Sequence, residues 1–242
     1  RFAVGTLAIW LLLSLSSPFM STEPDEIDLT RILPAPSMNQ IMGRDDLGRA
    51  VFARVIAGAG ISFGIAAVVV SVAGLFGTLL GLYSGWKGGM VDLIIVRLMD
   101  IFLAFPGILL TIALAGILGP GVGNVIIALT VVGWVGFARL ARAQTLSIKH
   151  RDHVVVARAL GTPPLLILMC HVLPLIAAPL SVEITFGIAG VIVAEASLSF
   201  LGLGIQPPNA SWGSMIRDGT RYMLVAPHLV IMPGLALMSV VI

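Results

Sequence analysis

The sequence predicts an all-α protein that crosses a membrane several times. Of its 242 residues, 58% are hydrophobic and only 11% are charged, whereas soluble domains carry about 25% charged residues. The mean hydropathy is +1.06. Apolar runs long enough to cross about 30 Å of hydrocarbon recur along the whole chain. From these runs we predict a polytopic membrane protein with six spans and with both ends on the cytoplasmic side.

Residues 1–20 contain the first apolar run, which we interpret as a transmembrane anchor. A cleaved signal peptide is the alternative, with Arg1 as the remainder of its basic segment. The Ser-Ser-Pro sequence at 16–18 makes a poor cleavage site and the run is long, so a retained anchor is favoured. The sequence begins without Met and stops within an apolar run at Ile242, and we expect both ends to be truncated.

Residues 21–53 form a polar segment that we place outside the membrane on the extracytoplasmic side. Its charges are mostly acidic, and it is Lys and Arg that are held on the cytoplasmic side. We interpret Asp45, Asp46 and Arg49 as the capped start of the next helix, with exposed charges. Residues 54–242 then form the main transmembrane domain with five further spans.

The second span is predicted at 54–83, where glycine recurs and lets helix backbones approach closely in lipid. The third span follows and ends near residue 118. Charges near its start are costly inside a membrane, and we expect an ion pair between Arg97 and Asp100, which share a helix face. Pro106 predicts a kink in this span.

The fourth span is predicted at 125–141, and the most basic part of the chain follows it. This part contains Arg139, Arg142, Lys149, Arg151 and Arg158. Because cytoplasmic loops carry an excess of Lys and Arg, we place it on the cytoplasmic side. Helix formers at 157–160, then Gly161 and two prolines, predict a short helix, a sharp break and a new apolar helix. Two interpretations remain: an interfacial loop helix, or a docking helix by which a soluble partner moves the membrane part.

The fifth apolar stretch, 165–201, is too long for one straight crossing, since about 20 residues suffice. Pro174 and Pro179 predict a kink or break within it. Glu183 and Glu195 also lie inside it, and ionisable residues within membranes are functional candidates by default. Because Glu195 lies near the outer end, a hydrogen bond between packed helices is an equally good interpretation for it.

Residues 195–219, EASLSFLGLGIQPPNASWGSMIRDG, end this helix and form an outer loop. We place Trp212 at the membrane interface, where tryptophan anchors well. The stretch closely resembles the Glu-Ala-x-Leu-Ser-Phe-Leu-Gly-Leu-Gly … Pro-x-x-x-Trp-Gly segment of dipeptide and oligopeptide permeases. The last span is predicted to begin near residue 226.

Three other segments carry the same resemblance. GRDDLGRA at 43–50 resembles the Gly-x-Asp-x-Leu-Gly-Arg-Asp segment of peptide and nickel permeases, with Ala50 in place of the final Asp. RLMDIFLAFP at 97–106 is similar to the signature of the family's third span. The stretch at 152–161 resembles the family's "EAA" loop, with Val155 where Glu is usual. In order and over nearly its whole length, the chain resembles the ABC-importer permeases of the dipeptide, oligopeptide and nickel family.

The resemblance implies the type I ABC-importer permease (MetI-like) fold, with six transmembrane helices and a cytoplasmic coupling helix in the loop at about 149–165. In that family the coupling helix sits in a cleft of the cytoplasmic ATPase. By position the coupling residues would be Asp152, Val155, Ala157, Arg158, Ala159 and Gly161. The implied partners are a second permease subunit, two ATPase subunits and an extracytoplasmic binding protein, assembled in the cell membrane and working by alternating access.

The favoured function is therefore the translocation path of an ATP-driven importer for di- or oligopeptides. A permease for nickel or another small solute is the alternative within the family. An ion-coupled secondary transporter is the alternative from another class, but the last three spans show no repeat of the first three. Asp100, Glu183 and Glu195 are the candidates for lining or gating the path, or for an ion site.

The sequence offers no catalytic or metal site. It lacks Gly-x-x-x-x-Gly-Lys-Ser/Thr, so we expect no ATP site and no cofactor in this chain, with ATP bound by partner subunits. The four histidines lack metal-ligand spacing, and one cysteine excludes an internal disulfide. The net charge of +2 is too small to indicate nucleic-acid binding.

Overall fold

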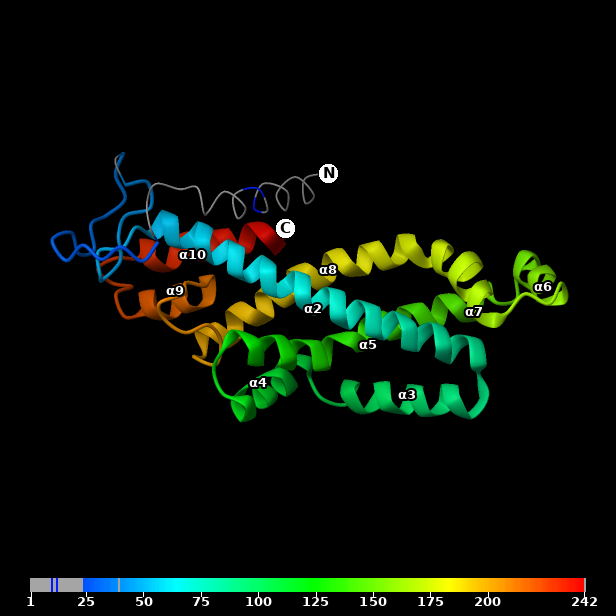
Figure 1. Cartoon of the computed structure of the whole chain (residues 1–242). Helices are drawn as coiled ribbons and strands as arrows, with labels where there is room; N and C mark the ends of the chain where they lie inside the picture. The colour runs from blue at the N-terminus through cyan, green and yellow to red at the C-terminus, as the bar shows by residue number, and fades with distance from the viewer. Residues whose placement is uncertain (1–9, 11, 13–23, 39, 242) are drawn as a thin grey trace. The chain divides into compact units, whose positions relative to one another are not determined.

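The computed structural model describes residues 10, 12, 24–38 and 40–241, and Figure 1 shows their arrangement into helices. These helices are α2 (Val51–Lys87), α3 (Gly89–Leu103), α4 (Gly107–Leu118), α5 (Val122–Ile148), α6 (Asp152–Ala159), α7 (Pro164–Ile167), the π-helical turn η2 (Leu168–Val172), α8 (Leu173–Phe200), α9 (Trp212–Thr220) and α10 (His228–Val241). The predicted anchor at 1–20 lies almost entirely outside the described residues and stays a prediction.

Three helices in the described part of the chain are long and apolar enough to cross a membrane: α2, α5 and the continuous helix Pro164–Phe200. They confirm the predicted second, fourth and fifth spans. α3 and α4 are apolar enough only as a pair, and α10 is an apolar helix of 14 residues. The number of six spans therefore remains a prediction.

The predicted kink at Pro106 is a complete break. α3 ends at Leu103, α4 begins at Gly107, and the two helices are bent by 82°. Proline has no amide hydrogen and disfavours helical backbone in the residue before it, so the helix cannot continue. The Pro106 carbonyl instead accepts the amides of Leu109 and Leu110 and starts α4.

The long stretch that contains Pro174 and Pro179 remains one helix. The π-helical turn η2 lies directly before Pro174, and Pro179 is accommodated inside α8. A proline ring clashes with the preceding helical turn, and proline lacks the amide hydrogen that would bond to that turn. A wider, π-helical turn accommodates both effects. The distortion that the sequence predicts is therefore a local π-helical turn.

The chain divides into two compact units. The first contains the residues up to Ala67, Ile112–Ala128 and the residues from Ile188 onward. In this unit α9 and α10 lie side by side (Figure 1). Trp212 is fully buried, and its indole N–H donates to the Val55 carbonyl at 2.9 Å. The prediction that Trp212 anchors at the interface is wrong, because its ring fills the core and its polar atom is satisfied there.

The second unit contains Val68–Thr111 and Leu129–Gly187. Trp134 is buried in this unit, with Phe76 and Phe102 edge-on at 5.7 and 5.5 Å between ring centroids. Glycines let the second half of α2 lie directly against α5. A Cβ added at Gly77 or Gly81 would lie 2.3 Å from a carbonyl oxygen of α5. This contact confirms the close packing predicted from the recurring glycines.

Candidate functional site

A polar cleft of about 590 Å³ lies in the second unit, where α3, α5 and α8 contribute its walls. Its charged and small side chains are Asp100 of α3, Gly136, Arg139, Arg142 and Ala143 of α5, and Glu183 of α8. The structure thus brings together two of the three carboxylates that the sequence singles out, Asp100 and Glu183.

Helical spacing explains which residues of α5 reach the cleft. Positions 136, 139, 140 and 143 follow the i, i+3, i+4, i+7 pattern of one helix face. Position 136 has no room for a side chain, because an added Cβ would lie 2.6 Å from the Glu183 Oε1 atom. The missing side chain therefore leaves room for the Glu183 carboxylate inside the cleft.

An ion pair in the second unit joins Asp92 to Arg142. Arg142 donates from Nε and Nη2 to the two Asp92 oxygens at 2.6 and 2.7 Å, and the Ser84 hydroxyl also donates to Asp92. A guanidinium that binds a carboxylate with two parallel hydrogen bonds forms one of the stronger ion pairs in proteins.

The predicted pair of Arg97 with Asp100 is wrong, since no such ion pair occurs among residues 24–38 and 40–241. Both side chains are exposed. Spacing along one helix identified neighbours on its face, but the partner that forms is Arg142 with Asp92, from another helix and 50 positions away in sequence. The basic residues after the fourth span are the sequence feature that could have pointed to Arg142 as the partner.

Three charges of the cleft remain without such a partner. In the part of the chain that the structure describes, the side chains of Asp100, Arg139 and Glu183 take part in no ion pair or hydrogen bond. Arg142, by contrast, is held by Asp92. The cleft therefore presents one guanidinium and two carboxylates that are free to interact.

Glu195 belongs to a different site in the first unit. It has 0% exposure and accepts hydrogen bonds from the Ser62 and Ser199 hydroxyls, both at 2.7 Å. The Ser199 oxygen in turn accepts the Ile205 amide at 3.1 Å. This geometry is that of a hydrogen bond between packed segments, one of the two interpretations that the sequence allowed. The carboxylate fixes the turn that follows α8.

The predicted short helix, break and new helix are confirmed at 152–167. α6 ends in a Schellman motif: the Gly161 amide donates to the Arg158 carbonyl, and the Thr162 amide donates to the Ala157 carbonyl. Gly161 has φ +80°, a conformation that favours glycine. Pro164 then begins α7, next to α6 in Figure 1.

α6 is held from two sides and leaves an apolar surface free. The Arg158 guanidinium lies 4.6 Å above the ring centre of Trp86, at the end of α2, and the His153 ring stacks at 6.5 Å on His171 of η2. Val154 and Ala157 are buried. The exposed hydrophobic residues are Val155, Val156 and Leu160. The helix thus has a fixed base and an exposed apolar face.

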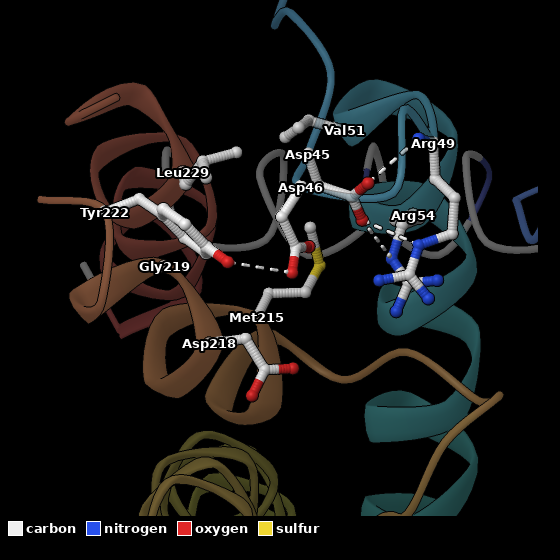
Figure 2. A pocket seen from close by; sticks show the side chains of 10 residues that line it. All are labelled: Asp45, Asp46, Arg49, Val51, Arg54, Met215, Asp218, Gly219, Tyr222 and Leu229. Carbon is white, nitrogen blue, oxygen red and sulfur yellow. Dashed lines mark hydrogen bonds and ion pairs between the residues drawn. The ribbon is translucent and has the colours of Figure 1, made fainter. Parts of the chain in front are cut away.

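The charges before α2 form, with Arg54 in its first turn, a network that was not predicted from the sequence. Asp45 accepts from Arg49 at 2.7 Å and lies 3.8 Å from Arg54, while Arg54 also donates to Asp25 at 2.7 Å. Figure 2 shows Asp45 facing both arginines and Tyr222 pointing at Asp46. The prediction of exposed charges is wrong for Asp45 and Arg49, because each of these side chains is only 13% exposed. An arginine at the start of an apolar helix is the sequence feature that could have predicted this network, since a buried charge needs partners.

Comparison with known proteins supplies the family. The family model described as "binding-protein-dependent transport system inner membrane component" matches residues 77–242. The dipeptide transport system permease protein DppC of Alkalihalophilus pseudofirmus is 39% identical over 98% of this chain and 76% of that protein. The glutathione transport system permease protein GsiD of Pectobacterium atrosepticum is 40% identical over 89% of this chain and 71% of its own length.

A solved structure of the MetNI methionine ABC transporter in inward-facing conformations contains a chain of the same fold. The two chains superpose with a TM-score of 0.65 at 18% identity, over 78% of this chain and 90% of that chain. The family model, the relatives and the fold agree. The chain belongs to the family of binding-protein-dependent transport system inner membrane components.

Proposed function

We propose that this chain forms the path by which an importer carries di- or oligopeptides across the cell membrane. The chain is a membrane-spanning permease subunit of an ATP-driven importer, and the ATPase is a separate subunit. The observation that carries the peptide assignment is the match to a dipeptide permease over 98% of the chain. Glutathione, in the name of a second relative, is itself a small peptide with free charged termini.

The charged cleft is our candidate for part of this path. Asp100 and Glu183 line it, and a hydrated or ligand-filled passage is where membrane-depth charges are tolerated. The burial of Glu195 and its two serine partners support a role in fixing the outer end of α8, near a gate, rather than direct contact with the substrate.

α6 is our candidate for the coupling helix that docks on a cytoplasmic ATPase. Its exposed apolar face supports this role, and so do its contacts with Trp86 and His171, through which a displacement of α6 reaches α2 and η2. The proposed coupling residues are Asp152, Val155, Ala157, Arg158, Ala159 and Gly161. Docking changes the state of the permease only if its free energy differs between the two conformations.

The proposed assembly contains a second permease subunit, two ATPase subunits and an extracytoplasmic binding protein. Both chain ends face the cytoplasm in this proposal, and the basic residues between α5 and α7 support the orientation. The segment before α2 and the segment around α9 would face the binding protein. Their hydrogen bond from Tyr222 to Asp46 supports placing both on the same side.

Uptake by the assembled transporter in proteoliposomes tests the proposal. We expect uptake of a radiolabelled dipeptide that requires ATP, the ATPase subunits and the binding protein. Unlabelled dipeptide should compete with the label, and Ni²⁺ should not. ATP-dependent uptake of Ni²⁺ without dipeptide uptake would replace the peptide assignment. Dipeptide uptake driven by a proton gradient without ATPases would contradict the proposed mechanism.

A further inference from the structure

We propose that the cleft of the second unit binds the two charged ends of a small peptide. Arg139 holds the C-terminal carboxylate, and Asp100 and Glu183 hold the N-terminal ammonium. This inference rests on the proposed function and adds to it a binding site, the chemical groups that the site reads and the role of Arg139.

The cleft offers one guanidinium that is free to bind a ligand. Two cleft residues carry guanidinium groups, but Arg142 already binds Asp92 through two hydrogen bonds of 2.6 and 2.7 Å. Arg139 is therefore the guanidinium available to a ligand. A guanidinium fork matches the two oxygens of a carboxylate. An anionic group that enters this cleft would bind Arg139.

The carboxylates of the cleft indicate which group binds at the other end of the ligand. Asp100 comes from α3 and Glu183 from α8, and Gly136 keeps the space into which the Glu183 carboxylate extends. With the Asp92–Arg142 pair neutral, Asp100, Glu183 and Arg139 leave the cleft with one net negative charge. Such a site favours a ligand that carries an ammonium group as well as a carboxylate, and it disfavours simple anions.

Small peptides fit both the size and the chemistry. A volume of about 590 Å³ lies within the range of roughly 300–1,000 Å³ that is usual for small-molecule sites. The ends of a dipeptide are at most about 7 Å apart in an extended chain, so one cleft can hold both. The remaining lining includes Val96, Met99, Leu140 and Ala143, which offer apolar contact without selecting one side chain.

Uptake of end-blocked peptides by the whole transporter tests this assignment. The probes are a dipeptide with free termini, its C-terminal amide and its N-acetyl derivative. For each peptide, we compare the initial uptake rate of the variant with that of the wild type, at saturating binding protein, and express the result as a ratio. Because the binding protein is the same in both measurements, its own preference cancels from the ratio.

We expect Arg139→Gln to lower uptake of the free dipeptide at least about tenfold, because a charged hydrogen-bond partner is lost. The same variant should lower uptake of the amide less than about twofold, since the amide has no carboxylate. Glu183→Gln should lower uptake of the free dipeptide and the amide alike and should spare the N-acetyl peptide. Arg97→Gln, an exposed arginine of α3 outside the cleft, should change no ratio.

Gly136→Ala serves as a second variant that keeps every charge. Its added methyl would displace the Glu183 carboxylate, so we expect the pattern of Glu183→Gln in weaker form.

Equal loss for all three peptides in Arg139→Gln would show a structural role and overturn the inference, as would no loss for any of them. If the wild-type transporter carries the free dipeptide and the ratios are uniform, only this inference fails. If the wild type carries no peptide, the proposed function fails with it.

Discussion

At the scale of single residues, Glu195 shows how a carboxylate can be stable with no exposed surface. Two serine hydroxyls donate to its oxygens, and one of these serines also accepts the Ile205 amide. Each polar atom of the group thus has a partner, which is the condition for burying it. The role that follows is to hold α8 against α2 and to fix the turn after α8.

We predict that Glu195→Ala lowers the free energy of unfolding by about 1–3 kcal/mol, because it leaves the Ser62 and Ser199 hydroxyls buried without their acceptor. Glu195→Gln keeps one acceptor oxygen and should cost less. Thermal unfolding of the purified complex in detergent measures both. Normal stability of both variants together with abolished peptide uptake would instead assign Glu195 a direct role in transport.

Sequence reasoning found the right residue types here but paired them incorrectly. The spacing of Arg97 and Asp100 predicted an ion pair on one helix, whereas the pair that forms joins Asp92 to Arg142. Helix spacing reports only neighbours on the same helix. The partner of Asp92 depends on how α3 packs against α5, and a sequence alone does not contain that information.

At the scale of helices, close contact between α2 and α5 depends on glycine. The residues involved recur every four positions at 77, 81 and 85, and each faces backbone or side-chain atoms of α5. The absence of a side chain lets the two backbones approach, which strengthens packing in lipid. The sequence predicted this use of glycine, because the repeat lies within one apolar helix.

We predict that Gly81→Ala destabilises the chain by about 1–3 kcal/mol, because its Cβ would lie 2.3 Å from the Ala138 carbonyl oxygen. Gly64→Ala is the matched control on the same helix, where an added Cβ meets nothing within 4 Å. The control should be neutral or stabilising by up to about 1 kcal/mol, from helix propensity. Thermal unfolding of the two variants compares them, and equal stability would contradict the packing argument.

The bend between α3 and α4 marks a limit of prediction for helices. Pro106 predicted a kink, and the structure has two helices at 82°. Proline determines that the helix is interrupted, but the direction of the following segment depends on its packing. The apolar runs predicted the long helices well, because length and hydropathy are local properties of a chain.

At the scale of the whole molecule, the two units carry different parts of the proposed function. The first holds the charged network before α2 and the Glu195 site. The second holds the polar cleft and α6. The resemblance of the motifs predicted the family and the position of α6. The cleft could not be predicted, since its residues come from three helices and only their packing brings them together.

In our proposal, this chain couples a peptide path to ATP hydrolysis through α6. The most direct measurement is dipeptide uptake per ATP hydrolysed by the full transporter with Gly161→Val or Gly161→Asn. At φ +80° valine is strained, whereas asparagine tolerates this conformation. We predict that Gly161→Val loses most uptake per ATP and that Gly161→Asn retains it. Equal uptake per ATP in wild type and both variants would contradict the claim that α6 transmits the energy of ATP.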